Sequence, residues 1–340
     1  MNQQPKHVLY SLLPKSAYQA MRNGWHQLLR LRHEGFYTAY YRRRLWPKIL
    51  TTPPVYTDPL GEASEVSVHL MCHQPDYLAA IWALKSFYYQ ARVSFPLVMH
   101  VQGPCTSKLE ADLRAHFPAA RLIFQQEANS VVEAFLLKHQ LKNLHRVRSR
   151  VPMMQKLTDN MIMGGSRHVL NIDSDILFFN EPTELTASRA TQALFQRDYQ
   201  DSYVITTERA RADFGVELQP QLCAGLALIS PALFDWQRCE SYFAHPAFSA
   251  LNGQAEQTIY ALEASRSRQV AYLPASYEIS PGGKVDCSAL KARHYAGPSR
   301  ALFTHEGIPY LIRSGFLENL QRTFTRREPA LAGAIRGDSF

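Results

Sequence analysis

The sequence predicts an α/β protein with a mixed, mostly parallel sheet flanked by helices, and three observations support this fold class. Short apolar runs alternate with helix-patterned segments between residues 66 and 274, which is the order of a βαβ protein. The 340 residues suffice for one large domain with extensions. Composition is ordinary, with 46% hydrophobic and 19% charged residues, which excludes low-complexity and collagen-like chains.

Residues 1–50 differ from the rest of the chain and predict a basic, helical N-terminal arm. They hold nine Lys or Arg and a single acid, Glu34, so the formal charge of +8 belongs wholly to them. Apolar residues at helical spacing predict an amphipathic helix over 16–33. Its mixture of basic and aromatic side chains suits an anionic membrane surface; packing of its apolar face on the main domain is the alternative. The Pro-rich residues 51–64 predict a linker.

Strands and helices are expected in alternation after the linker. Each expected strand is a short apolar run, and each expected helix carries apolar residues three or four positions apart. The strands are expected at 66–73, 96–103, 121–125, 168–179, 193–198, 203–206, 224–230 and 269–274. The helices are expected at 77–91, 107–117, 131–141, 152–164, 231–244 and 255–265. The run 168–179 is the most apolar and is expected to form a single strand.

The cysteines, the hydropathy and the charge indicate in which cellular compartment and with which partners the protein is expected. The five Cys are scattered, odd in number and without a CxxC pair, so neither a disulfide framework nor a structural zinc site is expected. The chain has no apolar stretch of membrane-spanning length and no signal-peptide pattern at its start. We therefore expect a cytoplasmic protein, peripheral on the inner face of the membrane if it is attached there. Residues 51–340 are charge-neutral, so no nucleic-acid partner is expected.

The run Asp173-Ser174-Asp175 at the end of the apolar strand is the candidate metal site. On an extended chain the side chains of residues i and i+2 point the same way. Two such carboxylates can take a hard cation such as Mg²⁺ or Mn²⁺, with a nucleotide diphosphate completing its shell. The alternative is a pair of solvated aspartates at a strand end.

The order of motifs resembles the GT-A-fold, Rossmann-like glycosyltransferases, most closely the retaining family-8 type. The resemblance spans residues 66 to 312 and implies a catalytic domain at 65–312 with a C-terminal tail at 313–340. The motifs that carry it are Cys72-His-Gln-Pro-Asp76-Tyr77, Asp173-Ser174-Asp175, Cys223-Ala224-Gly225-Leu226, Ala255-Glu256-Gln257 and His294-Tyr-Ala-Gly297-Pro-Ser-Arg300.

The resemblance also implies roles for individual residues. The metal ligands for Mn²⁺ or Mg²⁺ are Asp173, Asp175 and His294. Donor binding falls to Tyr77, which stacks on the base, and to Asp76, Asp173, Gly225, Gly297 and Arg300. The residues at the reacting centre are Glu256, Gln257 and Lys156.

Three departures from the family pattern indicate a divergent member. Arg300 stands where Lys is usual, Cys223 where Asn is usual and Glu256 where Asp is usual. The donor sugar and the stereochemical outcome stay open. The expected activity is metal-dependent transfer of a sugar from a nucleoside-diphosphate sugar, with UDP as the favoured nucleotide, to an acceptor hydroxyl. The acceptor is a lipid-linked saccharide, a polysaccharide or a small molecule.

Two other classes of function remain open from the sequence. A metal-dependent phosphohydrolase also places D-x-D at a strand end, with the first Asp as nucleophile. Its motif normally opens the domain, whereas Asp173 follows more than 100 residues of predicted domain. A membrane-binding or nucleic-acid-binding module led by the basic arm is the non-enzymatic alternative.

Overall fold

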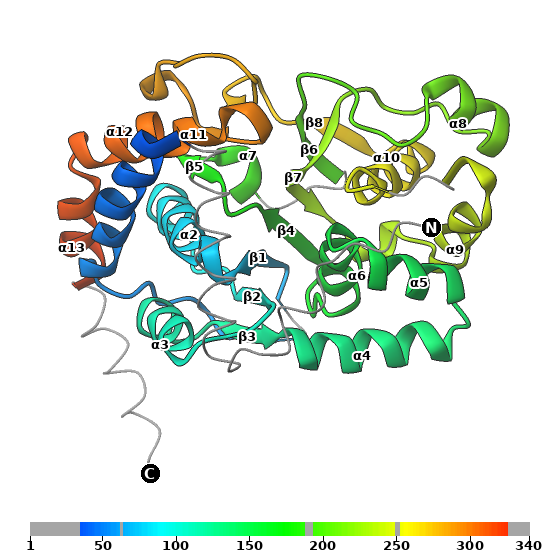
Figure 1. Cartoon of the computed structure of the whole chain (residues 1–340), viewed down its shortest axis with the longest axis horizontal. Coiled ribbons are helices and arrows are strands. Elements are labelled where there is room, and N and C mark those ends of the chain that lie inside the picture. Colours follow the sequence, from blue (N-terminus) through cyan, green and yellow to red (C-terminus); the bar gives the residue numbers. More distant parts are fainter. Residues whose placement is uncertain (1–34, 62–63, 188–192, 249–251, 326–340) are drawn as a thin grey trace, which may run out of the picture.

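The structure is a computed structural model of the chain, and it describes residues 35–61, 64–187, 193–248 and 252–325 (Figure 1). Two sheets organise these residues. The larger sheet has seven strands in the order β3-β2-β1-β4-β7-β6-β8. These strands are β3 (Arg121–Phe124), β2 (Leu97–Gln102), β1 (Val66–His73), β4 (His168–Ile172), β7 (Leu222–Ile229), β6 (Ala193–Arg197) and β8 (Val270–Tyr272).

Strand directions confirm the expected mixed, mostly parallel sheet. The pairs β3–β2, β2–β1, β1–β4 and β6–β8 are parallel, whereas β7 runs antiparallel to both of its neighbours. Side chains alternate across the sheet: Leu97, Met99 and Val101 enter one hydrophobic core, and Val98 enters the other.

Helices cover both faces of the large sheet, as the sequence predicts (Figure 1). The core on one face is closed by α2 (Tyr77–Ala91), α3 (Ser107–His116), α7 (Thr183–Thr186), α12 (Ile308–Arg313) and α13 (Phe316–Thr325). The core on the other is closed by α4 (Gln125–Lys138), α5 (Lys142–Arg150), α6 (Met153–Ile162), α8 (Thr207–Phe214), α9 (Trp236–Ala244) and α10 (Ala255–Ser267). The helix α2 is buried over most of its surface because it lies between the sheet and the C-terminal helices.

The apolar run 168–179 does not form one strand, so that prediction was wrong. The chain leaves the large sheet after Ile172, turns through Asp173-Ser174-Asp175, and continues as β5 (Ile176–Phe178). The strand β5 belongs to a second sheet, in which β10 (Ala292–His294) pairs with both β5 and β9 (Tyr277–Glu278). The turn is closed by a hydrogen bond from Ile176 N to Asp173 O of 3.2 Å. An apolar run indicates that its residues are buried, but not that they form one strand. Here the apolar residues of β4 and of β5 are all buried, although they belong to different sheets.

Other predicted boundaries also shift. Residues 203–206 are not a strand but lead into α8, whose first turn Thr206 caps through a hydrogen bond from Arg209 N. The helix predicted at 131–141 begins earlier, at Gln125, and α5 was not predicted at all.

The end of the basic arm is packed onto the domain. Residues 35–45 are helical, and the 3₁₀ turn η2 (Trp46–Thr51) follows. The Trp46 indole donates to Thr304 Oγ1 at 3.2 Å, and Trp82 Nε1 donates to the Trp46 carbonyl at 3.0 Å. The amphipathic helix predicted at 16–33 lies outside the described residues.

The Pro-rich segment that follows is held against the same core. The buried amine of Lys85 donates to the Pro53 carbonyl at 2.6 Å and to Thr52 Oγ1 at 2.7 Å. Burial lowers the pKa of Lys85 to about 7. At the other end of the chain, Phe316 and Leu320 of α13 lie in the core, so packed structure continues beyond residue 312.

Two neighbouring histidines, His69 on β1 and His100 on β2, are fully buried. His69 Nδ1 and His100 Nε2 are 3.1 Å apart, and His69 Nε2 lies 2.9 Å from Ser67 Oγ. Burial lowers the pKa of His69 to about 3 and that of His100 well below its ordinary value. Both rings are therefore neutral in the folded protein, whereas in the unfolded chain they take up protons below about pH 6.5.

We predict that stability falls on acidification because of this pair. A histidine whose folded pKa is depressed contributes stability above the unfolded pKa and loses it as pH falls. From pH 6.5 towards pH 3, each ring should lower the free energy of unfolding by about 1.4 kcal/mol per pH unit. Urea titrations over this range measure the slope. His100→Gln should remove one ring's share, whereas the exposed His73→Gln should not. Equal slopes in all three proteins would contradict the prediction.

Candidate metal and donor site

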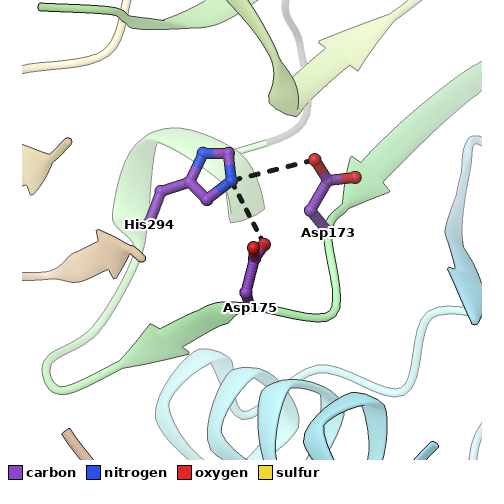
Figure 2. Close-up of side chains that lie close together, drawn as sticks. All are labelled: Asp173, Asp175 and His294. Carbon is purple, nitrogen blue, oxygen red and sulfur yellow. Dashed lines mark ion pairs between the residues drawn. The ribbon is translucent and has the colours of Figure 1, made fainter. Parts of the chain in front are cut away.

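Three side chains that could hold a metal ion meet where the two sheets join. Asp173 and Asp175 lie in the turn between β4 and β5, and His294 is the last residue of β10 (Figure 2). The antiparallel pairing of β5 with β10 sets His294 opposite Ile176. A hydrogen bond from Tyr295 N to Asp175 O, 2.9 Å long, extends that pairing into the turn. Sheet pairing thus joins two motifs that are far apart in the sequence.

The geometry of the three groups suits a hard divalent cation. His294 Nε2 lies 3.2 Å from Asp175 Oδ1 and 3.8 Å from Asp173 Oδ2. Figure 2 marks both ion pairs with dashed lines. One ligand atom from each residue can be chosen so that all lie within 4.8 Å of one another. Two carboxylates and an imidazole are a donor set for Mn²⁺ or Mg²⁺. The two aspartates converge because of a turn, not because an extended strand aligns them as the sequence predicted.

Opposite charges hold this cluster together. Burial alone would lower the pKa of His294, but the adjacent Asp175 carboxylate raises it well above its ordinary value. Burial would likewise raise the pKa of Asp175, and His294 and Arg300 hold it below its ordinary value. The imidazole and the carboxylate therefore form an ion pair. Metal ligands must be deprotonated, so a cation held by these residues would have to displace the proton from His294 Nε2.

Gly225 on β7 leaves the space that the cluster needs. Asp173 N donates to the Gly225 carbonyl at 2.8 Å, which brings β7 directly beneath the cluster. A Cβ atom at position 225 would lie 2.4 Å from His294 Cε1 and 2.7 Å from Asp173 Oδ2. Glycine is therefore required here for the close approach of two predicted metal ligands.

A cavity of about 210 Å³ opens beside the cluster. Lys156 Nζ, from α6, lies 2.7 Å from Asp173 Oδ1 and 3.9 Å from Glu256 Oε1, from α10. Glu256 Oε1 is buried and has no hydrogen-bond partner among the described residues. Burial raises the pKa of Glu256 to about 7; Lys156 opposes this effect and Asp173 adds to it.

A second group of predicted donor-binding residues lies on the Asp175 side of the cluster. Arg300 Nη1 is 3.6 Å from Asp175 Oδ2, and Arg300 Nη2 is 3.5 Å from Asp76 Oδ2. Gly297 has a positive φ of 53° in the turn between β10 and Arg300, where glycine is the most permissive residue. Tyr77, next to Asp76, begins α2, and its hydroxyl donates to Asp112 Oδ2 at 2.9 Å.

The predicted site residues therefore fall into two groups. The cavity is lined by Lys156, Asp173, Gly225, Glu256, Gln257 and His294. Asp76, Asp175 and Arg300 form the adjoining chain of ion pairs, with Tyr77 and Gly297 close to them in sequence. Within the described part of the chain, the Tyr77 hydroxyl is bonded to Asp112 and not to the aspartates of the turn.

Sequence reasoning missed several residues at the cavity. Asp198 directly follows β6, and Tyr199 and Ser202 come soon after it. Their position beyond a strand end was a usable signal, because ligands of open α/β sheets bind there. Gln196, whose Oε1 lies 3.2 Å from His294 Nδ1, carried no such signal.

No protein-family model and no curated protein sequence matches the chain. Among solved structures, the bifunctional glycosyltransferase WbbM is similar over 79% of this chain, with 14% identity and a TM-score of 0.46. The galactosyltransferase LgtC, solved with donor and acceptor sugar analogs, is similar over 68% of this chain and 87% of its own, with 14% identity and a TM-score of 0.47. Mouse xyloside xylosyltransferase 1 is similar over 68% and 97%, with 14% identity and a TM-score of 0.39.

These solved structures belong to the class of enzyme that the sequence motifs resemble. This chain spans about half, 53%, of the length of WbbM. With TM-scores below 0.5, the likenesses carry no conclusion about activity, which has to come from the site itself.

We predict that Gly225→Ala disrupts the metal site. The added methyl group would overlap His294 and Asp173, so one of them has to move. Binding of Mn²⁺, followed by calorimetry or by the electron paramagnetic resonance of the free ion, should weaken at least about tenfold. Gly282→Ala is the matched control, because a Cβ at that position meets nothing within 4 Å. Wild-type affinity in Gly225→Ala would show that the cluster does not bind the ion.

Proposed function

We propose that this protein is a metal-dependent glycosyltransferase that moves a sugar from a UDP-sugar to an acceptor hydroxyl. The observation that carries the proposal is the convergence of Asp173, Asp175 and His294 beside a cavity. At about 210 Å³, that cavity is smaller than the ~300–1,000 Å³ of drug-sized sites. It therefore suits a single sugar ring, with the nucleotide lying outside on the Arg300 side.

The charged residues around the cluster suit the departure of a diphosphate. Mn²⁺ or Mg²⁺ held by the three ligands would neutralise charge that builds on the leaving group. Arg300 is more than half exposed beside Asp175, so its planar guanidinium can grip a phosphate with two hydrogen bonds. Asp76, Gly297 and Tyr77 complete the donor site in this proposal, with the Tyr77 ring stacked on the base.

Residues across the cavity are placed to hold the sugar. Gln257 Nε2 donates to the Ser202 carbonyl at 3.3 Å, which leaves the amide oxygen of Gln257 to accept from a sugar hydroxyl. Glu256 Oε1, buried on the same side, accepts no hydrogen bond from another described residue. Lys156 lies between the two carboxylates, 2.7 Å from Asp173 Oδ1 and within ion-pair distance of Glu256 Oε1. A fixed arrangement of charge of this kind stabilises a transition state without reorganisation.

The lining of the cavity favours sugar transfer over phosphate-ester hydrolysis. Asp173, Asp198 and Glu256 contribute carboxylates, and Lys156 is the one lysine among the described residues that line it. Carboxylates accept hydrogen bonds from sugar hydroxyls but repel a phosphate.

We predict that the protein releases UDP from a UDP-sugar when Mn²⁺ is present. Asp175→Asn removes a direct ligand, and loss of an outer partner alone costs about 10–100-fold. We therefore expect kcat/KM to fall at least about 100-fold in this variant, and chelation to abolish turnover. Asp286→Asn is the control, because Asp286 is exposed and only caps a short helix. Unchanged turnover in Asp175→Asn would sink the metal-centred proposal, and rapid cleavage of a simple phosphate ester would favour the hydrolase.

We further propose that the protein is cytoplasmic and attaches peripherally to the inner, anionic face of a membrane. The helix at 35–45 exposes Phe36, Tyr37 and Tyr40 by 80%, 64% and 48%. Beside it a hollow of about 560 Å³ is lined by aromatic side chains and by the cations Lys48, Lys284 and Arg313. None of these cations forms an ion pair with another described residue. Aromatic and basic groups together suit an anionic interface.

A protein can cross a membrane with a helix or bind to the membrane surface. No helix in the described ranges is both long enough and apolar enough to cross a bilayer.

We predict that Lys48, Lys284 and Arg313 are needed for binding to anionic vesicles. Each basic residue near a charged surface contributes about 1 kcal/mol, so Lys48→Glu/Lys284→Glu/Arg313→Glu should weaken binding at least about 100-fold. Flotation with phosphatidylcholine vesicles, with and without phosphatidylserine, measures the effect. The matched control reverses Lys138, Lys142 and Arg150, which are exposed on α4 and α5. Equal flotation of both triple variants would rule out this surface, and no flotation of the wild-type protein would rule out attachment.

A further inference from the structure

We infer that Gln196 is a positioning residue, which fixes the ring orientation and tautomer of His294 so that Nε2 faces the metal. The inference rests on the proposed function, because it concerns the same metal site. Gln196 lies on β6, is fully buried, and touches neither aspartate of the cluster in any contact the structure gives.

The backbone of β6 turns Gln196 towards the site. The register between β6 and β7 is regular up to Phe195, opposite Ala227, and then shifts so that Gln196 pairs with Cys223. Such a bulge re-aims a side chain and is common beside functional sites. The shift brings the Gln196 side chain to the junction of the two sheets.

Two backbone carbonyls fix which way the Gln196 amide points. Its Nε2 donates to Glu278 O at 3.0 Å and to Tyr277 O at 3.3 Å. Carbonyl oxygens can only accept, so the NH₂ group has to face them. The amide oxygen is left on the other side, 3.2 Å from His294 Nδ1.

That oxygen determines where His294 carries its proton. An amide oxygen cannot donate, so Nδ1 has to be the donor in this hydrogen bond. In a neutral imidazole the other nitrogen is then unprotonated and can bind a metal. His294 Nε2 is the nitrogen that faces Asp173 and Asp175. The one other polar side chain close to Nδ1 among the described residues is Cys223, whose Sγ lies 3.6 Å away and is a weak partner.

The same amide also joins the two sheets. Tyr277 and Glu278 form β9, which pairs with the strand that carries His294. Gln196 belongs to the larger sheet. It nevertheless bonds both to the ring of His294 and to β9, the strand that pairs with β10 in the second sheet. Its removal should loosen the ring without unfolding either sheet.

The test measures Mn²⁺ binding to the full-length protein by calorimetry and electron paramagnetic resonance. Gln196→Leu keeps the volume and removes the acceptor, so affinity should fall about 10–100-fold. Gln196→Glu keeps an acceptor for the Nδ1 proton and, with its other oxygen protonated, a donor to the two carbonyls, so in that form it should retain affinity within about threefold of wild type. Cys223→Ala, which removes the weaker neighbour of the same nitrogen, should also bind like wild type. Thermal unfolding in chelator checks that each variant folds.

A second measurement detects the tautomer itself and needs no variant. With ¹⁵N-labelled histidine and Mg²⁺ bound, His294 in the wild-type protein should carry its proton on Nδ1. A proton on Nε2, or wild-type Mn²⁺ affinity in Gln196→Leu while Asp175→Asn loses binding, would overturn the role of Gln196 alone. Absence of Mn²⁺ binding by the wild-type protein would overturn both this inference and the proposed metal-dependent activity.

Discussion

The candidate site depends on the antiparallel pairing of β5 with β10. That pairing pulls the chain out of the large sheet after Ile172 and places His294 across from the aspartate turn. Without it, Asp173 and Asp175 would be two carboxylates at a strand end that repel each other. Each remaining group at the site reaches the same junction from a different element: Lys156 from α6, Gln196 from β6, Gly225 from β7 and Glu256 from α10. The junction of two sheets therefore assembles residues that no single element could bring together.

Opposite charges are closely matched at this junction. Asp173 is paired with Lys156, and Asp175 is paired with His294 and Arg300. The partner of Glu256 is the weakest, because Lys156 lies 3.9 Å away and is already paired with Asp173. Burial raises the pKa of Glu256 to about 7. Paired charges tolerate burial only while each partner stays in place. Arrival of a cation with a diphosphate would therefore redistribute these pairs: the cation would bind the two aspartates, and Arg300 would be free to pair with a phosphate.

The sequence predicts those parts of this arrangement that have local patterns. The helix at Tyr77–Ala91 and the strand at Val66–His73 follow from their apolar spacing, and the structure gives them the same bounds. Asp173 and Asp175 stand out because carboxylates interrupt an apolar run. The break of that run into two sheets could not be predicted, since both pieces are buried and burial is all that apolarity reports. Gln196 could not be predicted either, because its partners come from β9 and β10 and one glutamine in a strand forms no pattern.

The segment that follows β10 connects the donor site to the proposed membrane surface. Arg300 begins α11 (Arg300–Leu302) beside Asp175, and the π-helical turn η8 (Phe303–Gly307) continues directly from it (Figure 1). Thr304 and His305 of that turn line the aromatic and basic hollow; Thr304 accepts from the Trp46 indole, and His305 stacks on Tyr37. One short stretch of chain therefore touches the proposed diphosphate side of the site at its start and the proposed membrane-facing helix at its end. If the proposed membrane surface binds a bilayer, this short connection would set the orientation of the cavity relative to it, which is the geometric condition for an acceptor that is itself anchored in the membrane.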